Sequence, residues 1–493
     1  MYSSDRTSSD GAPLLEHFEP ENEIGNDTNE KRVERRAFWD CIHYRSIANT
    51  LTPSFWQRHA NSDVPRRPHP TAWLDGLRGV AAFLVYIYHY QHMFHQSYNF
   101  GYASNNGNHD HWLIQLSIIR LIANGQVQVA TFYVLSGVSL SLKPLRLARS
   151  HAFDKFHDTM FSSVFRRALR LYLPIFAVQT GVFIATLLGL YNHGYVLSQN
   201  WPYVGTNELM HTVFDSNWAQ TEDWLRAMWN YANPFLPNRP LYDVHLWTIP
   251  IEFRNSIILF ATLVGFSKLQ ARIRISLTVL LWVYCMSFGL TESETALFVA
   301  GMAIAEFILI QEEWGKQLPL TDASIKPLSK QSHVKCACWF ALGIVGLHLL
   351  SWPPLNADRT PGFRTLARMT PWGPFTEYFW QRTGAAVFVF ALSGSALLRY
   401  PFQTRLAIYL GKISFPLYIV HGPLNHTLGF WLVEVFFKIT GSETFAGYET
   451  GVFLAFCTEA VVVVWLADLV MRTVDGPSVR FGRWLQGKWE VRT

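Results

Sequence analysis

Apolar stretches of about twenty residues recur along most of this 493-residue chain. A helix needs about 20 residues to cross a hydrocarbon layer of about 30 Å, so each stretch predicts one membrane span. The ten predicted spans are 74–94, 120–142, 168–190, 246–266, 275–290, 295–311, 335–352, 383–398, 413–436 and 451–471. Nine or eleven spans are the alternatives, because 275–290 is short and 120–142 begins with polar residues. The sequence therefore predicts an all-α integral membrane protein with about ten transmembrane helices.

The composition is typical of a membrane protein. Hydrophobic residues make up 49% of the chain and charged residues 16%, whereas soluble domains have about 25% charged residues. Disorder does not explain the low charge, because disordered chains have few aromatic residues and this one has 15%. No basic block with interleaved aromatic residues stands outside the loops, so we expect no nucleic-acid partner. The five cysteines are too few and too scattered for a disulfide framework or a zinc site, and we expect no metal.

Lysine and arginine residues are distributed among the loops in a way that predicts the topology. The loop 143–170 carries seven of them, and the loop 95–112 carries none. Since basic residues are retained on the cytosolic side, we expect both termini in the cytosol and the protein in an endomembrane or the plasma membrane. The loop 353–382 is the exception, because it has four arginines and yet falls on the outer side.

Three further regions flank the ten-helix domain, which we place at 73–471 and which includes a Trp-rich non-cytosolic cap loop (191–245). They are a disordered acidic cytosolic tail (1–35), a basic aromatic juxtamembrane segment (36–72) and a basic cytosolic tail (472–493). The juxtamembrane segment suits a surface that lies against anionic lipid. A linker that merely follows the charge rule is the alternative.

The first predicted span contains ionisable residues, which are costly inside a membrane and are therefore candidates for function. Asp75 and Arg78 are three residues apart on one helix face and can form an ion pair. His89 follows Arg78 by 11 residues, so it lies on the same face about 16 Å away. Gly76 and Gly79 permit the close approach of a neighbouring helix or ligand.

Glu252 lies about six residues into the fourth span, at the depth of His89 if that span enters from the outside. A buried carboxylate beside an imidazole can orient the ring and hold its proton, which is the arrangement of a general base. We therefore predict that His89 and Glu252 form the catalytic pair. A hydrogen bond between helices is the alternative role of His89.

Two further segments carry polar groups toward the same region. Ser136, followed by a glycine, lies in mid-membrane. Arg166, Arg167 and Arg170 lie at the cytosolic mouth of the third span, where the forked guanidinium group suits phosphate oxygens. The alternative is that these arginines only obey the rule that basic residues face the cytosol.

Five motifs in this order resemble signature segments of the acyltransferase family 3 membrane proteins, and the chain is similar to fungal members. They are Leu74-Asp-Gly-Leu-Arg-Gly followed by His89, Phe-Tyr-Val-Leu-Ser-Gly at 132–137, Arg-Arg-x-Leu-Arg at 166–170, His245-Leu-Trp-Thr-Ile-Pro-Ile-Glu252 and Ser414-Phe-Pro-Leu-Tyr418-Ile-Val-His421. The chain departs from the family at Thr-Ile-Pro, where Ser-Leu-Ser is frequent. It also has large segments at 191–245 and 353–382.

The resemblance implies an integral membrane bundle of ten helices that transfers an acyl group, often acetyl, from cytosolic acyl-CoA to a hydroxyl of a glycan, lipid or small metabolite. It implies that His89 is the catalytic histidine. Asp75 and Arg78 would support the channel and the donor. Glu252 and His421 would line the site. Acyl-CoA would be a co-substrate, with no bound cofactor.

We expect acyl-CoA to bind with its phosphates near the three arginines and its pantetheine arm directed past Arg78. His89 would remove the proton of the acceptor hydroxyl as that oxygen attacks the thioester, while Glu252 holds the imidazolium. Direct transfer is favoured because no Ser or Cys is next to His89 in the sequence. An acyl-enzyme formed on Ser136 is the alternative.

Two other classes of protein fit the same residues. A solute transporter or exporter would use the buried charges as a substrate pathway, with His89 as a proton relay, and would consume no acyl-CoA. A non-catalytic scaffold or sensor has no reason to keep His89, Arg78 and Glu252 at the cost of burying them. Acyl transfer is therefore the favoured interpretation, and a monomer is the default state.

Overall fold

The computed structural model describes residues 50–57, 69, 71–105, 107–204, 210–235, 242–287, 290–317, 330–369 and 376–491. The tail predicted for 1–35 and most of the segment 36–72 lie outside these residues. Within the described ranges the chain is all-helical, with two isolated β-bridges and no strand. The all-α class is therefore confirmed.

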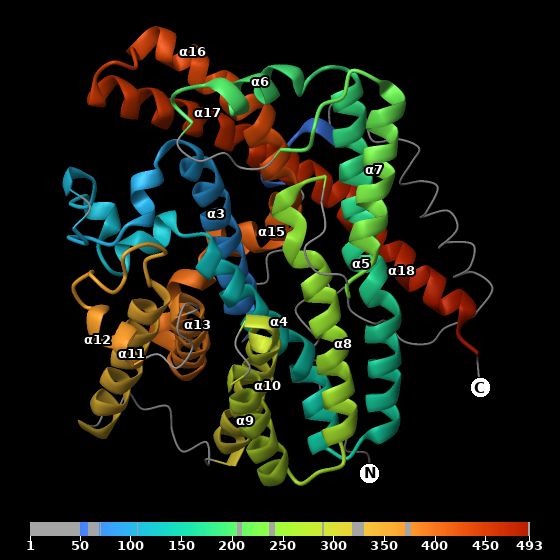
Figure 1. Ribbon diagram of the computed structural model, residues 1–493. Coiled ribbons are helices and arrows are strands. Elements are labelled where there is room, and N and C mark those ends of the chain that lie inside the picture. Colours follow the sequence, from blue (N-terminus) through green and yellow to red (C-terminus); the bar gives the residue numbers. More distant parts are fainter. Residues whose placement is uncertain are drawn as a thin grey trace.

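A helix occupies every predicted span. These helices, labelled as in Figure 1, are α3 (Ala72–Phe94), α4 (Gln126–Arg149), α5 (Phe153–Leu187), α8 (Thr248–Phe266), α9 (Ala271–Ser287), α10 (Leu290–Gln317), α11 (Lys330–Leu350), α13 (Thr376–Gly394), α15 (Arg405–Leu424) and α17 (Phe445–Val470). The span predicted for 413–436 is divided, because a π-helical turn, Asn425–Gly429, separates α15 from α16 (Phe430–Thr440). The shorter helices are α6 (Asn192–Asn200), α7 (Asn217–Ala232), α12 (Arg364–Arg368), α14 (Ala396–Arg399) and α18 (Gly476–Trp489).

In the part of the chain that the structure describes, fewer than ten helices have both the length and the apolar composition of a membrane span. Among the described residues, five stretches have the length and composition of a span: Phe153–Leu187, Val244–Phe266, Ser293–Glu313, His333–Leu350 and Phe445–Trp489. A sixth is counted if Tyr378–Gly394 and Ala396–Gln403, which are bent by 110°, are taken as one. The predicted count of ten is not confirmed, because helices such as α3 carry charged residues and α9 has only 17 residues.

Glycines allow α3 to pack closely against α15. A Cβ atom on Gly79 would lie 2.2 Å from the backbone nitrogen of Gly411, and one on Gly76 would lie 1.8 Å from the carbonyl oxygen of Phe402. The prediction that Gly76 and Gly79 permit a close approach is confirmed. This face of α3 therefore packs directly on the backbone of the segment that includes α15, and a residue larger than glycine at either position would prevent this contact.

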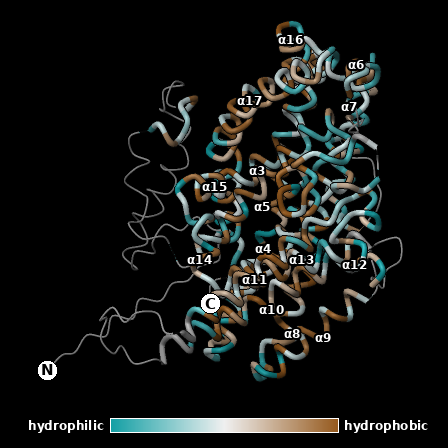
Figure 2. Tube along the Cα trace, turned by 90° about the vertical axis from the view of Figure 1, so that its left-hand side faces the viewer, coloured by the Kyte–Doolittle hydropathy of each residue, from teal (hydrophilic) through white to brown (hydrophobic). Residues whose placement is uncertain are grey.

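Shorter helices that lie outside the predicted spans pack against the long helices of the bundle. Figure 2 shows mainly hydrophobic residues along α8, α9 and α10. In the segment 191–245, α7 packs against α5 and α8, and α6 packs against α16; Figure 1 shows α6 and α16 at the same end of the bundle. The predicted tail 472–493 contains α18, which continues α17 through a π-helical turn and packs on α5.

The described part of the juxtamembrane segment lies on α17. The amide of Ser54 donates a hydrogen bond to Asp468 at 3.0 Å, and the indole of Trp465 donates to the carbonyl of Leu51 at 2.8 Å. Phe55 makes an edge contact with Tyr409 of α15. Residues 50–57 are thus held by specific contacts to the bundle.

Candidate active site

Three histidines from separate segments meet inside the bundle. His89 lies on α3, His245 in the 3-10 turn Val244–Trp247 that precedes α8, and His421 near the end of α15. The ring centroid of His89 is 4.3 Å from that of His245 and 5.2 Å from that of His421. The rings of His245 and His421 are 5.0 Å apart. We call these three residues the histidine cluster.

A buried carboxylate orients one ring of the cluster. Oδ1 of Asp243 lies 2.6 Å from Nδ1 of His245 and accepts a further hydrogen bond from the His245 amide. Burial raises the pKa of Asp243, but the charge and hydrogen bond of His245, with smaller contributions from His426 and His421, outweigh it and lower the pKa to about 2. The carboxylate is therefore ionised at neutral pH and keeps a proton on Nδ1 of His245.

Neighbouring helices fix the Asp243–His245 pair in position. The hydroxyl of Tyr231 on α7 accepts from the amide of Asp243 and donates to its carbonyl, both at 2.9 Å. The hydroxyl of Tyr418 on α15 donates to the carbonyl of His245. A Cβ atom on Gly422 would lie 2.2 Å from Nδ1 of His245, so only glycine leaves room for the ring.

The histidine cluster borders a cavity of about 370 Å³ that is lined by residues of α3, α4, α10, α13 and the turn before α8. Among the lining residues are His89, His92, Tyr133, His245, Trp247, Glu294 and Arg382. His89 is half-buried, whereas His245 and His421 are buried. His89 is thus the member of the cluster best placed to meet a molecule in the cavity, whose volume suits a small ligand.

Glu252 has a different partner from the predicted one. Its carboxylate forms an ion pair with Arg167 of α5, and Nε of Arg167 also donates to the hydroxyl of Ser256 at 2.9 Å. Equal depth on two helices does not determine which neighbour a side chain faces, so the inferred contact with His89 is corrected. The carboxylate beside the histidine cluster is Asp243.

The predicted ion pair on α3 is present. Nη1 of Arg78 lies 3.0 Å from Oδ1 of Asp75. Nη2 of Arg78 donates to the hydroxyl of Ser139 on α4 at 3.3 Å. This pair therefore ties α3 to α4 on the same helix that carries His89.

The remaining predicted residues lie on α4 and α5. Ser136 is buried within α4. Arg166 and Arg170 are half-buried on α5, while Arg167 is buried against Glu252. Of the three arginines, Arg166 and Arg170 retain surface that a phosphate could approach, and this role stays a prediction.

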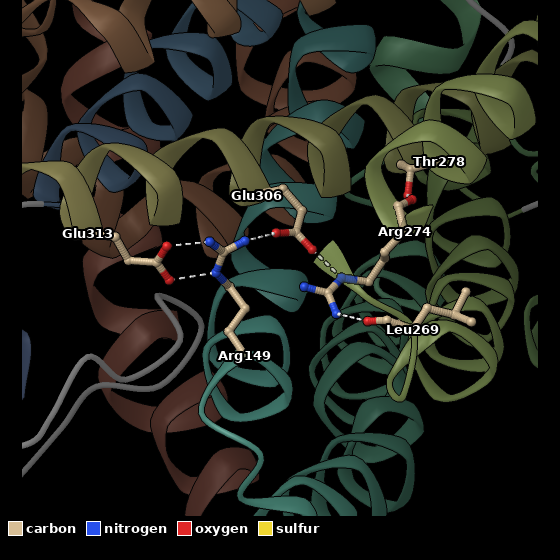
Figure 3. Close-up of polar contacts among 6 residues, drawn as sticks. All are labelled: Arg149, Leu269, Arg274, Thr278, Glu306 and Glu313. Carbon is tan, nitrogen blue, oxygen red and sulfur yellow. Dashed lines mark hydrogen bonds and ion pairs between the residues drawn. The ribbon is translucent and has the colours of Figure 1, made fainter. Parts of the chain in front are cut away.

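A second buried ionic cluster joins α4, α9 and α10 (Figure 3). The carboxylate of Glu306 is 1% exposed and pairs with both Arg149, at 2.9 Å, and Arg274. Arg149 also pairs with Glu313, and Arg274 donates to the carbonyl of Leu269 at 3.2 Å. Two arginines and two glutamates balance one another, so this cluster fastens the three helices together.

The histidine cluster also has the donor types of a metal site. One nitrogen from each ring lies within 4.8 Å of the other two. A zinc ion with Zn–N distances of about 2.0–2.1 Å needs its ligands about 3.4 Å apart.

Sequence reasoning did not find Asp243 and His245 as site residues. His245 opens the motif that ends at Glu252, and Asp243 precedes it by two residues. An aspartate just before a helix is typical of an N-cap, and Asp243 is the N-cap of the turn that carries His245. The N-cap position of Asp243, two residues before His245, was the sequence signal that could have identified this pair.

Comparison with known proteins identifies the class. The acyltransferase 3 family, described as an acyltransferase domain, matches residues 71–472. This chain therefore belongs to the acyltransferase 3 family and is a membrane-integral acyltransferase. The motif-based resemblance is confirmed.

The most informative relatives are fungal. The chain is 31% identical over 458 residues to the O-acetyltransferase PaAT-1 of Phomopsis amygdali, a match that covers 88% of this chain and 87% of the relative. It is 24% identical to the acyltransferase R4 of a Phoma strain, covering 84% of this chain and 95% of the relative. Acyltransferase clz18 of Cochliobolus lunatus gives the same identity and coverage. No solved structure matches the chain.

Proposed function

We propose that this protein transfers an acyl group, acetyl in the first instance, from acyl-CoA to a hydroxyl of an acceptor bound in the cavity. The family membership and the name of the O-acetyltransferase relative support the reaction type. The observation that carries the mechanism is the contact of His89 with the Asp243–His245 pair at the wall of the cavity. A histidine that is open to substrate and backed by a polar pair has the environment of a general base.

The chemistry that follows is direct transfer. His89 removes the hydroxyl proton while the acceptor oxygen attacks the thioester carbonyl. The carbon–sulfur bond then breaks, and the CoA sulfur takes up the proton from His89, so that an ester and CoA thiol are formed. The negative charge of Asp243, acting through His245, favours the positive charge that develops on His89.

The donor enters from the side of the membrane on which the basic residues gather. Arg166 and Arg170 bind its phosphates, and the Asp75–Arg78 pair lies along α3 between that side and His89. In this arrangement both ends of the chain are cytosolic, and the cavity lies toward the outer face. The positive-inside rule supports this orientation.

Labelled donor tests the proposal. Membranes that contain the wild-type protein, His89→Ala or His111→Ala are incubated with radiolabelled acetyl-CoA and a lipid and metabolite extract of the source cells. His111 is the matched control because its side chain is 60% exposed on a loop. We expect a labelled ester from the wild type and His111→Ala, with a loss of about 10²–10⁴-fold for His89→Ala.

Two results would contradict the proposal in different ways. If the wild type forms no labelled ester with acetyl-CoA or longer acyl-CoAs, acyl transfer to a hydroxyl is wrong and transport becomes the better explanation. If His89→Ala forms the ester at the wild-type rate, the reaction stands but His89 is not its base.

A further inference from the structure

A second polar group in the cavity takes no part in the mechanism above. Glu294 of α10 and Arg382 of α13 both line the cavity, and Nη2 of Arg382 lies 2.7 Å from Oε1 of Glu294. Their side chains are only 14% and 9% exposed. Arg382 was one of the four arginines that did not fit the charge rule in the predicted loop 353–382; it lies instead on α13 and is paired with Glu294.

A buried ion pair is weak evidence of a purely stabilising role. A buried pair loses hydration on both partners, and apolar residues of the same size often serve the fold as well or better. Here the carboxylate and the guanidinium also face space that a ligand can fill. A carboxylate accepts hydrogen bonds from hydroxyl groups, and a guanidinium carries five N–H donors. Because the two charges cancel, the pair suits a neutral polar group.

Four large aromatic side chains contribute to the rest of the cavity lining. Tyr88, Tyr133, Trp247 and Tyr378 line it, and the guanidinium of Arg382 lies 5.0 Å from the centre of the Tyr378 ring. Flat apolar walls favour a ring system. A volume of about 370 Å³ lies near the lower end of the range for small-molecule sites, so a glycan chain or a whole membrane lipid does not fit.

We infer that the acceptor is a compact, neutral ring compound with at least two hydroxyl groups. One hydroxyl meets His89 and is acylated, while the other is held by Glu294 and Arg382. This inference rests on the proposed function and adds to it the class of acceptor and the reason for regioselectivity. Fixing the second hydroxyl determines which position of the ring reaches His89.

Matched pairs of ring alcohols test the inference. Wild type, Glu294→Gln, Arg382→Gln and Glu312→Gln are assayed with radiolabelled acetyl-CoA on cyclohexanol against cyclohexane-1,4-diol, and on decalin alcohols with one or two hydroxyls. Glu312 is the matched control, because it lies on α10 as Glu294 does and pairs with an arginine, Arg146 of α4, but is half-exposed. For the wild type we expect kcat/KM to be about 10- to 100-fold higher for the diols, the value of one hydrogen bond to a charged group.

The variants separate recognition from folding. Glu294→Gln and Arg382→Gln should abolish the preference of kcat/KM for the diols over the single alcohols, whatever the activity that each variant retains. Circular dichroism and the melting temperature of each variant show whether it is folded. Glu312→Gln should behave as the wild type.

Three results would overturn the inference while the proposed function stands. Equal rates on single alcohols and diols would do so, as would equal losses on both in the two variants. A labelled ester from the cell extract that proves to be a glycan or a long-chain lipid would also exclude this acceptor class. If the extract yields no His89-dependent ester at all, the proposed function fails first and the inference falls with it.

Discussion

The Oδ1 atom of Asp243 lies 2.6 Å from Nδ1 of His245, whose ring makes an edge contact with His89 at the wall of the cavity. The carboxylate of Asp243 is thus connected to His89 of α3 through the imidazole ring of His245. It places a fixed negative charge behind His89, the residue that we propose meets the substrate.

Removing that charge should slow the reaction. We expect Asp243→Asn to lower kcat by about 10²-fold, with little change in KM for acyl-CoA, because an amide cannot stabilise the imidazolium. Steady-state kinetics with varied acyl-CoA measure both values. Asp110→Asn is the control, since Asp110 makes a similar contact of 2.7 Å with His111 away from the cavity. Equal losses in the two variants would show that Asp243 has only a structural role.

Gly422 should be essential to the position of the His245 ring. We expect Gly422→Ala to displace the His245 ring, because the new Cβ would lie 2.2 Å from Nδ1, and to lower kcat by at least about 10-fold. Gly181→Ala on α5 is the control, since an added Cβ there meets no atom within 4 Å. Circular dichroism and the acyl-transfer assay of both variants check this. Wild-type activity in Gly422→Ala would contradict the geometry.

Mild acid should lower the stability of the folded protein because of His211, in the segment 191–245. Burial and the neighbouring His426 lower the pKa of His211 to about 4, although Asp243 and the backbone of Tyr242 oppose the shift. Above pH 6.5 both folded and unfolded states hold a neutral ring. As the pH falls from 6.5 toward 4, only the unfolded state takes up the proton, so we expect a loss of up to about 3 kcal/mol.

Thermal unfolding of detergent-solubilised protein at pH 7.5 and pH 5 measures this loss. In His211→Asn, whose side chain does not titrate, the difference between the two pH values should shrink. A surface replacement, His111→Asn, should leave it unchanged. An identical pH dependence in wild type and His211→Asn would exclude His211 as its source.

Glu252 should matter to stability through its partner. We expect Glu252→Gln to destabilise the protein by about 3–5 kcal/mol, because it leaves the Arg167 guanidinium buried without its carboxylate. The double variant Glu252→Leu/Arg167→Met should recover most of that loss. Melting temperatures test this, and a failure of the double variant to recover would show that the pair does more than balance charge.

The all-helical class and the positions of the long helices were predictable because each long apolar stretch of the sequence forms a helix. The Asp75–Arg78 pair was predictable for a similar reason, since three-residue spacing on one helix fixes a contact. The partner of Glu252 was not, because helix depth says nothing about the direction in which a side chain points. Asp243 escaped notice because its importance depends on packing between a loop and the distant residues of α7 and α15.

The predicted count of ten spans is not confirmed, for a related physical reason. Helices that build the site carry the polar groups that chemistry needs, and these lower the apolar character by which spans are recognised. α3 is the example: it occupies the centre of the bundle yet contains Asp75, Arg78 and His89.

The unbroken helical stretch Phe445–Trp489 has 45 residues, which corresponds to about 68 Å along its axis. A hydrocarbon layer of about 30 Å accommodates less than half of that length if the helix stands upright. The stretch must therefore be steeply tilted or project far beyond the bilayer. Its first part packs on α15, which carries His421, and its last part packs on α5, which carries Arg166 and Arg170. One continuous helix therefore connects the two regions to which we assign the acceptor and the donor, and it limits changes in the distance between them.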